Sequence, residues 1–533
     1  MSGSADAKAE GARERSKLAA RAGVVGAGTL ASRLLGLGRD MALAGIFGRG
    51  ETDAFFVAFT IPNALRQILG EGAVSSAVVP VLSGKLATEG DEAAQAFFAR
   101  VRGASLLALT AVTVLGMVFA RQLCQLFASG YEGATFERTV VLTRLVFPYI
   151  FFMGTAALGM AALNAKRRFA VAAFAPGLLN VAFLLAAFLL PAPLVAAGFD
   201  RSYAMAIGAL LGGVLQVVAQ WPALRAIGFL RMPRLDFADP GVRDVLRRLG
   251  PMTFGIGVYY IDLVLSRRFL SELGEGAQSY FSWAMRLCDF PQGIFVMALS
   301  TAALPSLSAL AAKGEHGEVA KTYAHGMRLA LFVALPCSVA LAALGQPIVA
   351  MLFQRGHFDA VASAETARSL LWQGGAIWTV AAVRQIVPVF YALGDTRTPV
   401  VVSAVDLVAF IVLAVVLRVP MGHAGISAAV AGSSFVQMAL LFVGLRRKLG
   451  TVCGAEILGS SARTLAASAL AGASGWGIAR LLGGHGTLLP GLAACVVFVA
   501  LFVGVAWALR SPELDEVLGG VRRRLARGRT AQG

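Results

Sequence analysis

Residues 31–48 read ASRLLGLGRDMALAGIFG, an apolar stretch that carries three charges, Arg33, Arg39 and Asp40. The chain around it has 533 residues, of which 57% are hydrophobic and only 14% charged, and its mean hydropathy is +0.72. A soluble protein carries about a quarter charged residues. Because apolar runs recur along the whole chain, the sequence predicts an all-α integral membrane protein that crosses the bilayer many times.

Counting roughly 20 apolar residues per crossing predicts about fourteen transmembrane helices. They are expected at 22–47, 54–83, 101–120, 139–163, 171–192, 203–224, 245–270, 279–309, 325–345, 365–393, 399–418, 424–445, 458–481 and 488–509. A polar tail at 1–21, without the pattern of a cleaved signal peptide, comes before them, and a basic tail at 510–533 comes after.

Loops rich in Lys and Arg, such as 166–168, 225–248 and 446–448, alternate along the chain with loops that are poor in them. This positive-inside pattern predicts that both termini are cytoplasmic. The net charge of +17 on its own would be compatible with nucleic-acid binding. Its distribution over alternate loops argues against a nucleic-acid groove.

Two short polar turns, AALNAKRRFA at 161–170 and VFYALGDTRTP at 389–399, each join one predicted span to the next. About six spans separate them, which favours two six-helix lobes of the same orientation around a central cavity. The lobes are expected at 22–230 and 239–450. The last two spans, within 455–509, are then an addition to the pair.

Several charged residues lie in the middle of predicted transmembrane spans. A charged side chain at the centre of a span costs roughly 2.5–3.5 kcal/mol to insert. Four central arginines, Arg33, Arg39, Arg66 and Arg286, would together cost roughly 10–14 kcal/mol. They cannot face lipid at that cost, so we expect them to line a wet cavity.

Helical spacing supports this placement. Arg33 and Asp40 are seven residues apart and share one helix face, and Asn63 and Arg66 are three apart and share another. Arginine keeps its charge when partly desolvated and binds phosphate or carboxylate through two hydrogen bonds. An excess of arginine in a cavity therefore indicates an anionic substrate that carries phosphate. The alternative for Arg39 and Asp40 is an ion pair that only holds helices together.

Two further acidic residues lie in apolar segments, Asp262 in YYIDLVL and Asp406 in VSAVDLVAF. Carboxylates within the membrane suit a monovalent cation or a proton. We therefore expect Asp262 and Asp406 to bind a coupling Na⁺ or proton. The alternative is a hydrogen-bonded carboxyl or the partner of a nearby arginine.

Motifs of catalysis are absent from the sequence. It has no Walker A pattern, and its cysteines and histidines have neither the spacing of a zinc site nor that of a disulfide framework. We expect a transporter rather than an enzyme, with no cofactor. The five histidines are expected to be ordinary surface residues: His316, His325, His357, His423 and His485.

Several of these stretches, in order from about residue 20 to 450, resemble the MurJ (MviN) family of lipid II flippases in the MOP exporter superfamily. They are SRLLGLGRD, TDAFFVAFTIPNALRQILGEGAVSSAVVP, ALNAKRRFAVAAFAPGLLN, RLCDFPQGIFVMALSTAALPSLS, LFQRGHF, FYALGDTRTP and GHAGISAA. The resemblance implies alternating access in the bacterial inner membrane, driven by membrane potential or a cation gradient. It implies lipid II, the undecaprenyl-diphosphate-linked precursor of peptidoglycan, as the substrate. It further implies a groove for the polyprenyl tail at the last two spans and contacts with membrane lipids and cell-wall synthesis proteins.

Matched to the family's motifs, the substrate-binding residues are Arg33, Arg39, Asp40, Asp53, Asn63, Arg66 and Arg286. A sodium site similar to that of some members falls on Asp262 and Asp406.

The chain departs from the family pattern at Thr60, where many members carry lysine, and at Met285, where an acidic residue is common. Three alternatives stay open. They are a flippase for another polyprenyl-diphosphate-linked oligosaccharide, a MATE-like antiporter of cations or drugs, and a non-transporting scaffold that recruits cell-wall enzymes. Arginines in place of acids and aromatics in the first lobe argue against the antiporter, and a short C-terminal tail argues against the scaffold.

Overall fold

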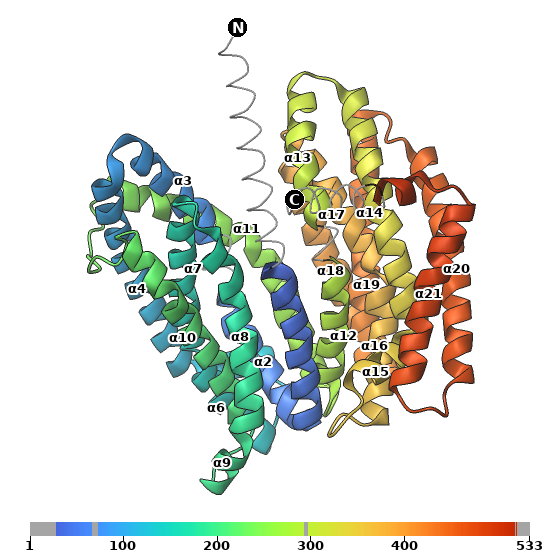
Figure 1. Ribbon diagram of the computed structural model, residues 1–533, viewed down its shortest axis with the longest axis horizontal. Helices are drawn as coiled ribbons and strands as arrows, with labels where there is room; N and C mark the ends of the chain where they lie inside the picture. The colour runs from blue at the N-terminus through green and yellow to red at the C-terminus, as the bar shows by residue number, and fades with distance from the viewer. Residues whose placement is uncertain (1–27, 67–72, 293–296, 518, 520–533) are drawn as a thin grey trace, which may run out of the picture. The chain divides into compact units, whose positions relative to one another are not determined.

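Alanine, leucine, glycine and valine are the most frequent residues of the chain. So apolar a sequence satisfies its backbone hydrogen bonds within helices when the surroundings are lipid. The computed structural model describes residues 28–66, 73–292, 297–517 and 519, and all regular elements in these ranges are helices (Figure 1). By its internal contacts the chain divides into two units, one up to Glu272 and one from Leu273 onward.

The first unit begins with a helix at 28–46, followed by a series of helices up to α11. These are α2 (Arg49–Arg66), α3 (Ala73–Thr88), α4 (Gly90–Val118), α5 (Ala120–Phe127), α6 (Gly133–Val146), α7 (Tyr149–Ala165), α8 (Phe169–Leu189), α9 (Pro191–Ala196), α10 (Tyr203–Ala226) and α11 (Pro240–Ser271). Helix α10 packs against α7 and α8, and α2 packs against α6. Helix α11, which the sequence assigned to the second lobe, packs against α3, α4 and α5.

The second unit contains α12 (Ala277–Pro291), α13 (Met297–Ala312), α14 (His316–Ala343), α15 (Gly345–Phe353), α16 (Ala360–Gly375), α17 (Ile377–Ala392), α18 (Arg397–Met421), α19 (His423–Leu449), α20 (Gly454–Leu481) and α21 (Leu488–Ala508). Helices α18 and α19 form an antiparallel pair, and so do α20 and α21. Helix α14 joins these pairs to the rest of the unit because it packs against α16, α17 and α20.

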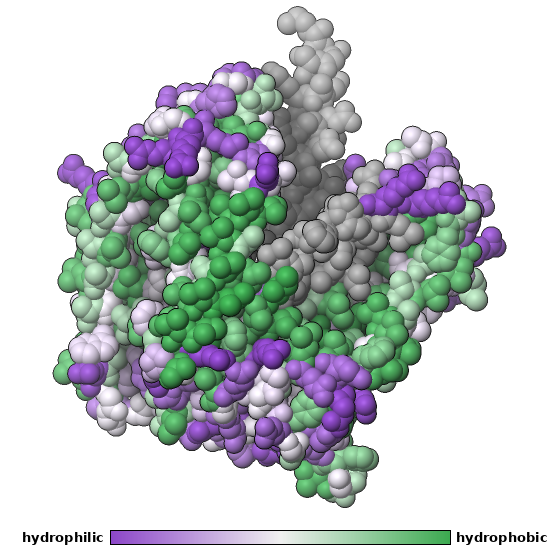
Figure 2. All heavy atoms as spheres, turned by 180° about the vertical axis from the view of Figure 1, so that it is seen from behind, coloured by the Kyte–Doolittle hydropathy of each residue, from purple (hydrophilic) through white to green (hydrophobic). Residues whose placement is uncertain are grey.

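Eight helices in the described ranges are long and apolar enough to cross a membrane. They are Gly90–Val118, Gly133–Ala165, Tyr203–Ala226, His316–Ala343, Ala360–Ala392, Arg397–Met421, His423–Leu449 and Leu488–Ala508. Figure 2 shows hydrophobic residues gathered along the middle of the helices and hydrophilic residues towards their ends, as a bilayer requires. A multi-pass helical membrane protein is therefore confirmed, whereas the count of fourteen spans stays a prediction.

Close packing of the first helix on α8 positions the first group of predicted site residues. A Cβ atom added to Gly28 would lie only 2.7 Å from the Ala173 carbonyl oxygen, so glycine is needed for this approach. Further along the same helix, a Cβ at Gly36 would lie 3.7 Å from the amide of Asn180. The two helices thus meet over at least two turns, and the polar side chains between them are brought into contact.

Candidate functional site

Arg39 is held by partners on its own helix and on α8. Its Nε and Nη2 donate to Asp40 Oδ1 at 2.9 and 2.7 Å, and its Nη1 donates to Asn180 Oδ1 at 2.9 Å. Asn180 Nδ2 donates in turn to the carbonyl oxygen of Ser32 at 2.9 Å. The guanidinium carbon also lies 5.3 Å from the centre of the Phe183 ring. All three nitrogens of Arg39 therefore have partners, and Asp40 neutralises its charge.

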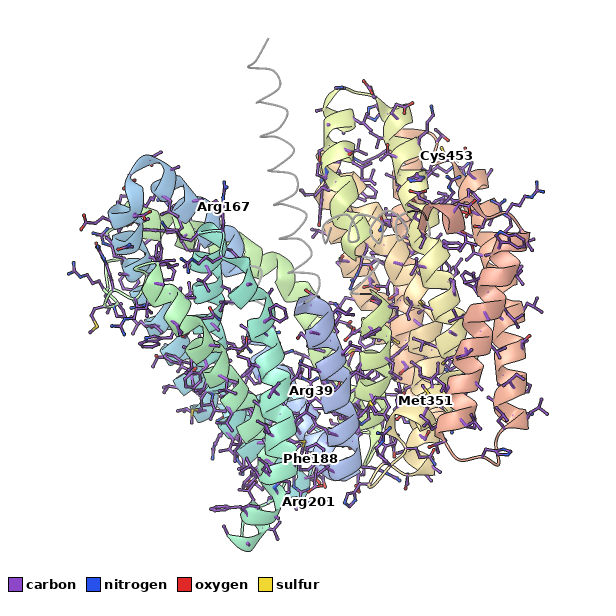
Figure 3. All side chains as sticks on the ribbon, in the orientation of Figure 1. Arg39, Arg167, Phe188, Arg201, Met351 and Cys453 are labelled. Carbon is purple, nitrogen blue, oxygen red and sulfur yellow. The ribbon has the colours of Figure 1, made fainter. Side chains whose placement is uncertain are left out.

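This cluster lies well inside the first unit. Figure 3 shows Arg39 between Arg167, at one end of the helices, and Arg201, at the other end. The side chains of Arg39 and Asp40 are only 11% and 8% exposed. At that depth an unpaired guanidinium would be costly, which explains why Asp40 directly follows Arg39. The sequence analysis gave this ion pair as an alternative to substrate binding. It did not find Asn180 or Phe183, which lie far from Arg39 in the chain.

Asn63 and Arg66 contact each other as their spacing predicted. Arg66 Nε donates to Asn63 Oδ1 at 3.0 Å along α2. Asn63 is uncharged, so this contact orients the guanidinium without neutralising it. Three residues before Asn63, Thr60 donates its hydroxyl hydrogen to the Phe56 carbonyl at 2.6 Å, so it packs as part of the helix.

Asp53 is almost fully buried, at 1% exposure, near the start of α2. Burial raises the pKa of Tyr131 well above its usual value, and the Asp53 carboxylate raises it further, while Arg267 lowers it. Asp53 and Arg267 therefore lie within electrostatic reach of the same phenol. Arg267, on α11, is itself only 3% exposed. The sequence analysis did not single out Arg267, although its position in an apolar helix was a usable signal.

Two other predicted substrate residues, Arg33 and Arg286, are half-buried on different units. Arg33 lies on the helix at 28–46 in the first unit, and Arg286 lies on α12 in the second. Each unit therefore contributes arginine to the predicted set. Their role in substrate binding stays a prediction.

The predicted cation residues are likewise divided, with Asp262 on α11 of the first unit and Asp406 on α18 of the second. Asp406 Oδ1 is buried without a hydrogen-bond partner. The Ser433 hydroxyl of α19, which donates to the Val430 carbonyl at 3.3 Å, lies close enough to influence the Asp406 carboxyl. One turn along, Gln437 donates to Ser403 at 3.3 Å. A carboxylate and a hydroxyl within the membrane fit a proton or one monovalent cation. No group of three or more His, Cys, Asp or Glu that could hold a metal ion occurs among the described residues.

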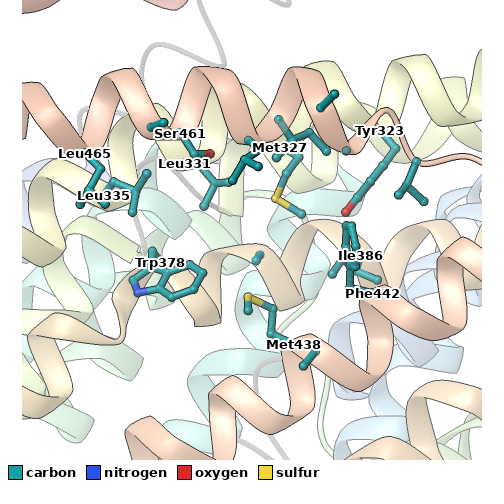
Figure 4. Close-up of a pocket in the computed structure, with 18 of the residues that line it drawn as sticks. Tyr323, Met327, Leu331, Leu335, Trp378, Ile386, Met438, Phe442, Ser461 and Leu465 are labelled. Carbon is teal, nitrogen blue, oxygen red and sulfur yellow. The ribbon is translucent and has the colours of Figure 1, made fainter.

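An apolar cavity of about 1160 Å³ lies inside the second unit, between α14, α17, α19 and α20 (Figure 4). Its walls include Tyr323, Met327, Leu331, Leu335, Trp378, Ile386, Met438, Phe442, Ser461 and Leu465. Arg446, in the last turn of α19, contributes a charge to the lining. The hydrocarbon walls fit a lipid chain. Of the four helices around this cavity, only α20 belongs to the last two predicted spans, where the groove for the polyprenyl tail was expected.

One expectation about the histidines is wrong. His423, at the first turn of α19, is only 9% exposed and lies in a network of polar side chains. It appeared to be a loop residue because the glycine before it interrupts the apolar pattern. His325, by contrast, is half exposed and contacts Glu516 at 3.2 Å.

Comparison with known proteins identifies the family. Residues 43–493 match the family model described as "Lipid II flippase MurJ". The chain is 34% identical over 434 residues to the lipid II flippase MurJ of Burkholderia cenocepacia, an alignment that covers 79% of this chain and 82% of that protein. It is also 34% identical over 432 residues to the probable lipid II flippase MurJ of Vibrio cholerae, with coverage of 79% and 82%.

Solved structures show the same fold. A structure described as "Lipid II flippase MurJ, inward closed conformation" matches with a TM-score of 0.72 at 21% identity, over 91% of this chain and 99% of that chain. An inward-facing multidrug transporter of the MATE family in the MOP superfamily matches with a TM-score of 0.63 at 16% identity, over 79% and 96%. The expected superfamily fold is confirmed.

Proposed function

This chain belongs to the MurJ family of lipid II flippases, and from that premise we propose that it moves lipid II from the inner to the outer leaflet of the bacterial cytoplasmic membrane by alternating access. The match to the family over residues 43–493 carries this proposal. The chain is a transporter and not an enzyme. Its MATE-like relatives share the fold at 16% identity, so they are a weaker guide to substrate than the MurJ proteins at 34%.

The diphosphate of lipid II is proposed to bind the arginines of the first unit. Arg286, on the second unit, is proposed as a further substrate-binding residue. Arg39 is held by Asp40 through two short hydrogen bonds to one carboxylate oxygen. A diphosphate offers several anionic oxygens in the fork geometry that guanidinium prefers. The diphosphate would compete with Asp40 for Arg39. The buried arginine would then be paired with Asp40 when no substrate is bound and with the diphosphate when lipid II is bound. Arg66, oriented by an uncharged asparagine, supplies positive charge to the same substrate group.

The polyprenyl tail is proposed to occupy the apolar cavity between α14, α17, α19 and α20. Its hydrocarbon lining and its volume of about 1160 Å³ support this role. Helix α20 is the first of the two helices beyond the second predicted lobe, which is where the resemblance places the tail. With the polyprenyl tail in this cavity, only the polar headgroup of lipid II would need to bind the arginines.

Loop charges support the orientation in which both termini are cytoplasmic. With the inside negative, each negative charge that moves outward gains roughly 2.3 kcal/mol per 100 mV, so membrane potential drives an anionic headgroup in the required direction. A cation or proton at Asp262 and Asp406 is proposed to reset the empty carrier. Contacts with cell-wall synthesis proteins stay a prediction.

The test is the appearance of lipid II at the outer face of cells in which this protein is the only flippase. Wild type is compared with Arg66→Ala and with Arg66→Lys, which keeps the charge but loses the fork, at equal protein level. We expect transport by wild type, loss with alanine and a partial defect with lysine. If wild type exposes no lipid II, lipid II is not the substrate. Other polyprenyl-diphosphate-linked glycans are then tested next, because arginines that bind phosphate do not distinguish the sugar. If Arg66→Ala transports normally, the account of phosphate recognition is wrong.

A further inference from the structure

The imidazole of His423 connects two helices of the second unit. Its Nε2 lies 2.8 Å from Glu365 Oε2, and its Nδ1 lies 2.8 Å from the hydroxyl oxygen of Ser369. Both partners are on α16, one turn apart. The ring of Tyr280 on α12 lies 5.2 Å from the imidazole ring, centre to centre. Ser369 is fully buried and Tyr280 is 5% exposed, so the imidazole is enclosed except at Glu365.

These contacts fit one protonation state of the imidazole best. A carboxylate can only accept, so Nε2 carries a hydrogen and donates to Glu365. The neutral ring then has a lone pair on Nδ1, which accepts the hydroxyl hydrogen of Ser369. A doubly protonated ring has no lone pair there. The Ser369 hydroxyl hydrogen would have to turn away to another acceptor in a fully buried position.

A second layer of polar contacts lies one turn deeper on the same helix faces. Gln373 follows Ser369 by four residues on α16, and Ser427 follows His423 by four on α19. Gln373 Nε2 donates to the Ser427 hydroxyl oxygen at 2.9 Å and to the carbonyl oxygen of Phe281 on α12 at 3.4 Å. The two layers together tie α12, α16 and α19 at one end. Helix α12 carries Arg286, five residues beyond Phe281.

The order of groups, glutamate then histidine then serine, is also that of a hydrolase triad. Ser369 is at 0% exposure, however, so no substrate can reach its hydroxyl oxygen. The arrangement therefore holds helices rather than performing catalysis.

The charges around His423 decide what a proton would do. From α16, Arg368 Nη1 donates to the same Glu365 oxygen at 2.8 Å, so the carboxylate is already paired. From α12 the ring meets the uncharged Tyr280. On α18, which packs against α19, the charged residue closest to His423 in the sequence is Arg418, in the last turn of that helix. At 9% exposure, burial disfavours a charged imidazole; Glu365 favours it, and Arg368, which pairs with the same carboxylate, opposes it.

We propose that His423 is a positioning residue whose neutral imidazole ties α19 to α16, the helix that in turn holds α12 and its Arg286 through Gln373, and that acid on the outer side loosens α12 by protonating the imidazole. In the topology proposed above, this end of α19 faces outward. The link to α12 rests on contacts within the second unit alone. The consequence for transport rests on the proposed function, so acid outside is expected to slow lipid II export.

The first experiment measures hydrogen exchange of α12 in the purified full-length protein in lipid nanodiscs at about pH 7.5 and about pH 4.5. The lower pH lies well below the usual histidine pKa, because burial disfavours the charged ring. Exchange is corrected for its intrinsic pH dependence. We expect wild type to lose protection in residues 277–286 severalfold at the lower pH. His423→Gln keeps a donor and an acceptor but cannot titrate, so its protection should not change with pH. His485→Gln, in a loop of the same predicted side, is the matched control and should behave as wild type.

Ser369→Ala provides a second, independent variant. This variant lacks the hydroxyl that donates to Nδ1 of the neutral His423 ring. Without it the ring should be protonated at a higher pH, so α12 should begin to lose protection from exchange at a higher pH than in wild type. The proposal is overturned if wild-type α12 shows no pH response, or if His423→Gln or Ser369→Ala responds as wild type does.

The second experiment measures lipid II exposure with the outer pH at the same two values. Wild type should export less at the lower pH, and His423→Gln should export equally at both. Equal wild-type export at both pH values overturns the effect on transport. If exchange behaves as expected but no lipid II is exported at either pH, the proposed function fails while the positioning role of His423 stands.

Discussion

The hydrogen bond between Arg39 and Asn180 joins two helices within the membrane, and its coupling energy can be measured. A double-mutant cycle replaces Arg39 by methionine and Asn180 by leucine, singly and together. Hydrogen bonds between membrane helices average roughly 0.6 kcal/mol in such cycles, with a maximum near 1.7. The bond here is charge-assisted, 2.9 Å long, and made by an asparagine that is 6% exposed and donates to the Ser32 carbonyl as well. We therefore expect coupling near the upper limit, about 1–2 kcal/mol.

The assay is unfolding of the purified protein by SDS, followed by circular dichroism, for wild type, both single variants and the double variant. A control cycle pairs Arg39→Met with Gln216→Leu, a buried residue on α10 whose amide contacts the Met153 sulfur at 3.2 Å. That pair should be additive to within about 0.5 kcal/mol. Coupling for Arg39 and Asn180 no larger than the control would refute the view that Asn180 holds the guanidinium.

Three further predictions concern other parts of the molecule. A hydrogen bond from Lys448 at 2.6 Å holds the pKa of Asp395 well below its usual value; the stability from this pair is complete above about pH 4 and lost as the pH falls towards the folded-state pKa. Acid unfolding of Asp395→Asn should lack this component, and an unchanged acid transition would contradict it. Val443→Trp places bulk in the cavity of the second unit and should weaken export of lipid II more than binding of a headgroup analogue with a short tail, whereas Val416→Trp, on the exposed side of α18, should affect neither. At a fixed pH of about 7.5, Asp406→Asn should make export insensitive to sodium; wild-type export that already ignores sodium would rule out sodium binding at Asp406.

Local sequence spacing was enough to predict contacts within one helix. The contact of Arg66 with Asn63 follows from the helical repeat alone, because positions three apart lie on one helix face whatever surrounds them. Composition likewise determined the solvent, since a chain this apolar with so few charges can satisfy its backbone in lipid only as helices.

Contacts between helices were decided by the tertiary structure. Asn180 reaches Arg39 across 141 residues of chain, and Glu365 reaches His423 across 58. Neither partner is marked by local pattern, because an asparagine or histidine in an apolar segment looks the same whether its neighbour is lipid, backbone or a charge. Which helices pack together depends on the shape of whole helix faces, such as the glycine at position 28 that lets its helix approach α8. The sequence by itself thus determined the lipid environment and the charges to be accommodated there, and the packing of helices determined which side chain meets each of them.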